Sequence, residues 1–131
     1  EGRTIPQIFE EKDEAYFRVK ETEAIEIVMS GVQQVISTGG GAVLKEYNCQ
    51  KLSESGYVIA LIADAETIIS RVKKDTNRPL LQGNLEQRVY QMLEERKHAY
   101  QFADKQIDTA QRTIEDLVGI ILESRNSDLK L

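Results

Sequence analysis

The segment Tyr57–Ile62 (YVIALI) decides the fold, because an unbroken apolar run of this length is typical of a strand buried on both faces of a parallel sheet. Asp64 follows it and can cap a helix that we expect over about Ala65–Lys73. A last short strand is expected at Gln106–Asp108. Strands that alternate with helices predict an α/β domain with a mostly parallel sheet.

Upstream of this segment the sequence predicts helices and one further strand. Thr4 and Pro6 mark the start of the first helix, because a hydroxyl caps a helix well and proline fits its first turn. The β-branched pair Val35-Ile36 predicts a short strand that leads into the glycine turn Gly39–Gly41. The helices are expected at about residues 5–12, 14–30 and 45–54.

Downstream of Lys73 the helical pattern is interrupted. The polar segment Lys73–Asn84 contains Pro79 and Gly83, which predicts a mobile loop. A helix is expected from about Leu85 to Tyr100. The last helix is predicted to be amphipathic, with apolar residues at helical spacing at Ile114, Leu117, Val118, Ile121 and Leu122.

Composition limits the classes of function. The chain has 131 residues, which suits a single domain spanning 1–131, and 40% hydrophobic with 30% charged residues is normal for a folded protein. A net charge of −5 without a dense basic block argues against nucleic-acid binding. No apolar run reaches the roughly 18 residues of a membrane helix, and the single Cys49 excludes a disulfide framework, so we expect a cytoplasmic protein.

The glycine turn and a set of arginines are the candidate functional residues. Three consecutive glycines permit positive φ and close approach of a ligand to backbone amides, although a tight structural turn explains them equally. A guanidinium grips carboxylate or phosphate with parallel hydrogen bonds, but each arginine alone is more often a surface charge. Those of interest are Arg18, Arg71, Arg78 and Arg96.

Two of these positions have a distinctive setting. Arg78 precedes a proline and two leucines inside the predicted loop, where closure over a nucleotide would bring its charge to a transferring phosphate. Glu21 stands one helical turn after Arg18, where it contributes a surface ion pair or holds the guanidinium beside a substrate.

Taken together and in order, several segments resemble the signatures of the shikimate kinase family. They are Thr4-Ile5-Pro6-x-Ile8-Phe9, Glu14-Ala15-x-Phe17-Arg18-x-x-Glu21, Ser37–Ala42, Asn77–Leu81 and Glu95-Arg96-x-x-x-Tyr100-x-x-Ala103. The resemblance implies a P-loop, nucleoside-monophosphate-kinase-like fold with three αβα layers. It also implies transfer of the γ-phosphate of ATP to the 3-hydroxyl of shikimate, with Mg²⁺, in aromatic amino acid biosynthesis.

The resemblance assigns roles on the substrate side. Arg18 and Arg96 are expected to bind the carboxylate of shikimate, and Glu21 is expected to orient Arg18. Gly39, Gly40 and Gly41, chiefly the last two, are expected to offer backbone amides near the substrate hydroxyls and the γ-phosphate. A small hydroxylated carboxylate fits recognition by two convergent arginines.

On the nucleotide side, the resemblance makes residues 73–84 a lid loop. Arg78 is expected to be its catalytic arginine, which stabilises the migrating phosphoryl group. Arg71 is expected to lie against the adenine, and Arg112 to border it. No residue of the chain is expected to bind the metal.

The sequence departs from the family pattern in two places. It contains no GxxxxGK[ST] loop, and the family's first strand, expected between those at Val35 and Tyr57, is also absent. We therefore expect the 131 residues alone to be inactive and to expose apolar strand edges, whereas the complete protein is expected to be a monomer. Asp13 stands where the family usually has glycine, which makes the conformation before Glu14 uncertain.

Two other functions are compatible with these residues. A remnant that binds shikimate or a nucleotide without catalysis would still use Arg18 and Arg96, but it would have no chemical need for Arg78. A kinase for another small metabolite, such as gluconate, would not need the Phe-Arg-x-x-Glu segment to hold a carboxylate.

Overall fold

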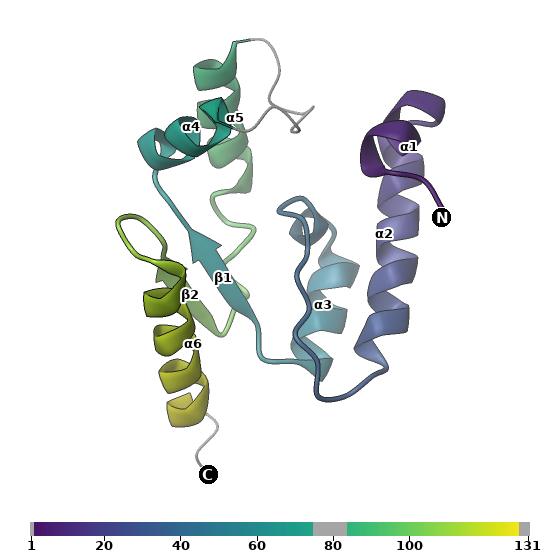
Figure 1. Cartoon of the computed structure of the whole chain (residues 1–131). Coiled ribbons are helices and arrows are strands. Elements are labelled where there is room, and N and C mark those ends of the chain that lie inside the picture. The colour runs from purple at the N-terminus through teal and green to yellow at the C-terminus, as the bar shows by residue number, and fades with distance from the viewer. Residues whose placement is uncertain (1, 75–83, 129–131) are drawn as a thin grey trace. The chain divides into compact units, whose positions relative to one another are not determined.

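The computed structural model describes residues 2–74 and 84–128, which divide into two compact units on either side of the Gly56–Tyr57 bond. The first unit contains α1 (Ile5–Glu11), α2 (Glu14–Met29), the 3₁₀ helix η1 (Ala42–Leu44) and α3 (Glu46–Ser55). The second contains β1 (Ile59–Ile62), α4 (Ala65–Lys73), α5 (Leu85–Arg96), β2 (Lys105–Asp108) and α6 (Ile114–Asp128) (Figure 1). The prediction of one domain over 1–131 stays a prediction.

The helix starts of the first unit are encoded locally. The Thr4 hydroxyl accepts from the backbone of Gln7, and the Gln7 side chain accepts from the backbone N–H of Thr4, which forms a capping box. Asp13 caps α2 by accepting from Tyr16 N at 2.8 Å, so its carboxylate fixes the conformation of the chain before Glu14.

The core of the first unit lies where α2 and α3 pack side by side. Ile25 of α2 and Leu52 of α3 are buried there, together with Ala42 at the start of η1. Val28, which the sequence places on the same face of α2 as Ile25, is more than a third exposed. Helices α2 and α3 therefore form the main packed contact of the first unit.

The predicted strand at Val35-Ile36 is wrong for the part of the chain that the structure describes. Residues 34–39 have no regular secondary structure, and Val35 is 101% exposed. A strand exists only when a neighbour completes its hydrogen-bond ladder, and the described sheet contains only β1 and β2. Val35 and Ile36 favour a strand by residue type, but no described strand lies beside them to pair with.

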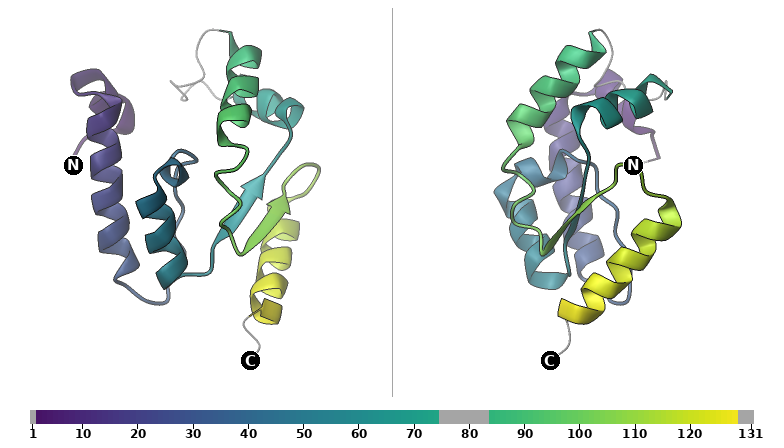
Figure 2. Two further views of the ribbon diagram at one scale, coloured as in Figure 1. Left: turned by 180° about the vertical axis from the view of Figure 1, so that it is seen from behind. Right: turned by 90° about the vertical axis from the view of Figure 1, so that its left-hand side faces the viewer.

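In the second unit β1 and β2 lie side by side and are parallel, with Ile59 opposite Lys105 and Ile62 opposite Asp108 (Figure 2). This confirms the strands predicted within Tyr57–Ile62 and Gln106–Asp108. Asp64 caps α4 by accepting from Thr67 N at 2.7 Å, and hydrogen bonding to Thr67 lowers the pKa of Asp64.

Helix α5 ends at Arg96, four residues before the predicted end at Tyr100. The cause is the pairing of Asp104 with the residue before β1. Asp104 N donates to Val58 O at 2.9 Å, and Val58 N donates to the Asp104 carboxylate at 2.7 Å. The chain has to turn back early to reach this position, and it does so through a series of i to i−3 turns.

Helix α6 forms over the predicted apolar positions and continues to Asp128, but it buries none of its residues. Its apolar stripe is open, with Ile114 80% exposed and Val118 and Leu122 about half exposed. In β1, Leu61 is also exposed. Among the described residues, no helix is both long enough and apolar enough to cross a bilayer.

Candidate functional site

Helix α2 presents Arg18 between two carboxylates. Arg18 Nη1 donates to Glu21 Oε1 at 2.9 Å, and Arg18 Nη2 donates to Glu14 Oε1 at 3.2 Å. The Arg18 side chain is 24% exposed and that of Glu21 only 13%. Since these bonds engage two of the five N–H donors of a guanidinium, Arg18 is held in one orientation with donors left for a ligand.

The Arg18 guanidinium lies directly on the backbone of Gly41. A Cβ built at Gly41 would lie 2.7 Å from Arg18 Nη1 and 2.8 Å from Cζ, distances at which something must shift. Gly41 itself has a φ of −83°, and the only described glycine with positive φ is Gly2. Position 41 therefore requires glycine because the Arg18 guanidinium approaches its backbone closely. A positive φ, which glycine would also permit, does not occur at Gly41.

Two aromatic rings that the sequence analysis did not single out support the arginine. The Phe17 ring lies under the Arg18 guanidinium, with 5.2 Å between Cζ and the ring centroid. Phe9 of α1 packs against Phe17 with ring centroids 5.0 Å apart. Phe9 and Phe17 both belong to the segments that resemble the family. Their contact joins two helices, however, and the sequence alone does not show which helices pack together.

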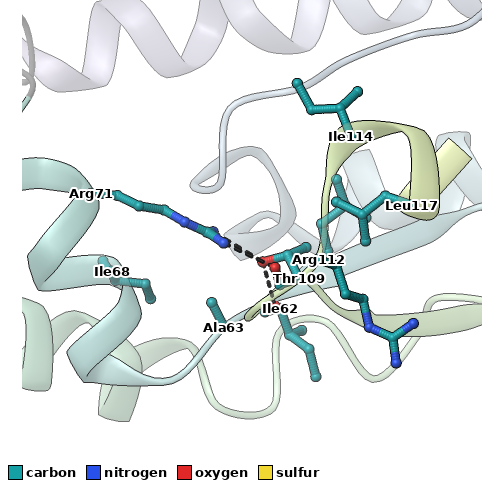
Figure 3. A pocket seen from close by; sticks show the side chains of 9 residues that line it. Ile62, Ala63, Ile68, Arg71, Thr109, Arg112, Ile114 and Leu117 are labelled. Carbon is teal, nitrogen blue, oxygen red and sulfur yellow. Dashed lines mark hydrogen bonds between the residues drawn. The ribbon is translucent and has the colours of Figure 1, made fainter.

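The second unit has an open cavity of about 530 Å³ at the carboxyl ends of β1 and β2 (Figure 3). This end of a parallel sheet is where α/β proteins usually bind ligands. Apolar side chains line most of it, and two arginines provide charge. The lining residues are Leu61, Ile62, Ala63, Ile68, Arg71, Thr109, Arg112, Ile114 and Leu117.

Arg71 is fixed at this cavity by the loop after β2. Its Nη1 donates to the Thr109 hydroxyl and its Nη2 to the Thr109 carbonyl, each at 3.0 Å (Figure 3). The Thr109 hydroxyl in turn donates to Ile62 O at 3.0 Å. This chain of bonds ties α4, β1 and the loop together, so the plane of the Arg71 guanidinium is set before a ligand arrives.

The remaining predicted site residues belong to different parts of the chain. Arg112 is exposed at the rim of the same cavity as Arg71. Arg96 is half-buried at the end of α5 and belongs to the second unit, whereas Arg18 belongs to the first, so their convergence stays a prediction. Arg78 and most of the predicted lid, residues 75–83, lie outside the described residues.

Comparison with known proteins decides the family. A sequence model described as shikimate kinase matches residues 1–125. The chain belongs to the shikimate kinase family. It is 38% identical over 122 residues to the shikimate kinase of Desulforudis audaxviator, covering 93% of this chain and 65% of that protein. The shikimate kinase of Geobacter sulfurreducens is 42% identical over 118 residues, with 89% and 65% covered.

A solved member of the family has the same fold. The structure titled shikimate kinase from Acinetobacter baumannii in complex with shikimate superposes with a TM-score of 0.92 at 38% identity, covering 98% of this chain and 74% of that one. The predicted fold class is confirmed: the chain has the α/β fold of the P-loop shikimate kinases, with a parallel sheet flanked by helices. The chain spans about two thirds of the length of the curated relatives named above.

Proposed function

We propose that the protein is a shikimate kinase, which transfers the γ-phosphate of ATP to the 3-hydroxyl of shikimate. The proposal rests chiefly on the setting of Arg18, which is held by Glu14 and Glu21 and lies on the backbone of Gly41. The chain that contains this arrangement belongs to the shikimate kinase family. A solved relative at 38% identity is titled as a complex with shikimate. ATP and a monomeric state belong to the same proposal.

The fixed guanidinium suits a small carboxylate. A charge-assisted hydrogen bond to an arginine contributes about 1.5–3 kcal/mol, and orientation by Glu21 reduces the rotamer freedom that binding would otherwise remove. In this proposal Arg18 binds the carboxylate of shikimate and Arg96 supplies a second guanidinium. Gly39, Gly40 and Gly41 then face the hydroxyls of the same molecule, because Arg18 lies on Gly41.

The cavity of the second unit suits the base of a nucleotide. Apolar side chains from β1 and α6 offer surface to a flat ring, and Arg71, fixed by Thr109, offers a guanidinium plane for stacking. Arg112 adds charge at the rim. In this proposal Arg78 is the cation that stabilises the negative charge of the phosphoryl group during its transfer.

The metal is not assigned to this chain. Among the described residues no group of three or more His, Cys, Asp or Glu side chains is placed to hold a metal ion. Mg²⁺ would neutralise phosphate charge during the transfer. The chain's own residues contribute binding and orientation: Arg18 at the carboxylate, the glycine turn at the hydroxyls, and Arg71 at the base.

The proposal is tested by acceptor-dependent release of ADP from ATP, measured on the protein as its gene encodes it. Shikimate is expected to support turnover and gluconate to support none. Arg18→Met is expected to raise the KM for shikimate by at least about 100-fold, because the loss of two charge-assisted hydrogen bonds costs about 3–6 kcal/mol. The KM for ATP should stay within about threefold.

The matched control removes an arginine at the far end of α6. Arg125 is exposed and does not line the cavity, so Arg125→Met should leave both KM values at the wild-type level. Equal use of gluconate, or an unchanged KM for shikimate in Arg18→Met, would contradict the proposal. Calorimetric titration of shikimate into both variants measures the same effect without turnover.

A further inference from the structure

A buried amide joins the helix that carries Arg18 to the glycine turn. The Asn48 side chain, on α3, is 1% exposed. Its Nδ2 donates to the carbonyl of Ala42 at 2.9 Å, and its Oδ1 accepts from the Thr22 hydroxyl, also at 2.9 Å. Thr22 and Ala42 are buried as well. No buried polar side-chain atom in the described residues lacks a partner, so this small network is fully satisfied.

The two ends of the network lie next to the residues of the candidate substrate site. Thr22 follows Glu21 in α2 and lies one helical turn after Arg18. Ala42 follows Gly41, on which the Arg18 guanidinium lies. The Asn48 amide therefore spans from the arginine helix to the turn and sets the separation at which Arg18 and the turn face a ligand.

An amide completes both bonds at this position, because it carries both a donor and an acceptor. The Ala42 carbonyl accepts and needs a donor, while the Thr22 hydroxyl donates here and needs an acceptor. Aspartate has nearly the same shape but offers no donor to Ala42 when ionised, and an apolar residue would leave both partners unsatisfied in a buried place. Packing alone does not require an amide there.

We propose that Asn48 is a positioning residue for shikimate, which acts by fixing the glycine turn against Arg18. The inference rests on the proposed function, since it concerns the same substrate. It predicts a defect that is selective for the acceptor, because the cavity proposed for the nucleotide base is built entirely from residues of the second unit.

Asn48→Asp tests the proposal, because it removes the bond to Ala42 with almost no change in volume. The KM for shikimate is expected to rise about tenfold, roughly the effect of one buried hydrogen bond. The KM for ATP should stay within about twofold. Thr22→Val should also raise the KM for shikimate. Thr22→Ser, which keeps the hydroxyl, should leave that KM at the wild-type value.

Leu52→Ala is the matched control. Leu52 is buried on α3 one turn after Asn48, so its truncation destabilises the same helix without touching the turn. It should lower the melting temperature and leave the ratio of the two KM values unchanged. If Asn48→Asp merely lowers the melting temperature as Leu52→Ala does, or raises both KM values alike, the positioning role is wrong.

A measurement without turnover separates this proposal from the proposed function. Backbone amide resonances of Gly39–Gly41 should shift, and their hydrogen exchange should accelerate about tenfold, in Asn48→Asp relative to wild type. Unchanged turn amides would overturn the positioning role even if the enzyme is active. Wild-type protein that neither binds nor phosphorylates shikimate would overturn the proposed function and, with it, the role of Asn48 toward that substrate.

Discussion

Helices α3 and α6 differ in how far their side chains are buried. Helix α3 packs on α2, buries Leu52 and places Asn48 in a satisfied polar network. Helix α6 buries no residue and keeps its apolar stripe open. An apolar stripe marks a face suited to a partner, but it does not identify that partner.

The same difference in packing distinguishes the proposed shikimate site near α3 from the proposed nucleotide cavity near α6. Around α3, side chains from distinct segments fix one another, so Arg18 and the glycine turn have a defined geometry. Around α6, the cavity has one fixed guanidinium, that of Arg71, beside apolar residues that remain accessible. The substrate side is therefore the more completely built of the two in the described chain.

The largest expected effect tests this contrast by the same truncation on both helices. Leu52→Ala should lower the free energy of unfolding by about 2–4 kcal/mol, because it leaves a cavity in a packed contact. Leu122→Ala should change it by no more than about 0.5 kcal/mol, because the side chain is half exposed. Urea titrations followed by circular dichroism measure both, and equal losses would show that α6 is as well packed as α3.

A second comparison uses the same substitution at two glycines. Gly41→Ala should push the Arg18 guanidinium off the turn and weaken shikimate binding by about 10- to 100-fold, the worth of roughly one charge-assisted hydrogen bond. Gly119 lies inside α6 with nothing within 4 Å of an added Cβ. Gly119→Ala should therefore stabilise the protein by about 0.5–1 kcal/mol.

Calorimetric titration of shikimate and thermal melts separate the two outcomes. Gly41→Ala should remain folded, since the atom that it meets is the end of a long side chain that can move away. Shikimate binding that is unaffected by Gly41→Ala would mean that the contact between Arg18 and the turn has no part in recognition.

Much of the fold could be predicted because its signals are local. Thr4 and Asp64 cap their helices through bonds to residues three positions on, and such bonds depend on a few neighbouring residues only. The strand predicted at Val35 is absent from the described structure, because strand formation does not depend on local residues alone. Its existence depends on a neighbour, and the described residues provide none.

The candidate site shows the same division between local and distant contacts. The bond between Arg18 and Glu21 follows from their spacing on one helix and was anticipated. The requirement for glycine at position 41 was attributed partly to positive φ, whereas the structure attributes it to the approach of Arg18 from another element. Asn48 carried no sequence signal, because its role arises from two partners that are distant in the chain.

The smallest expected effect concerns a hydrogen bond at the far end of α6. The Tyr57 hydroxyl donates to the Asp128 carboxylate. That hydrogen bond, together with desolvation and the negative charges of Asp128 and Asp104, raises the pKa of Tyr57 to about 12. A raised pKa means that the folded state favours the protonated phenol.

The contribution of Tyr57 to stability is therefore complete below the ordinary tyrosine pKa of about 10 and is lost as the pH rises from there through the folded-state value. Unfolding free energies measured between about pH 8 and pH 12 should fall less steeply for Tyr57→Phe than for wild type. Tyr90→Phe, at an exposed position on α5, is the control and should follow the wild-type slope. If Tyr57→Phe has the wild-type slope as well, the bond does not hold α6 in solution, and the contrast between α6 and the packed helix α3 becomes sharper still.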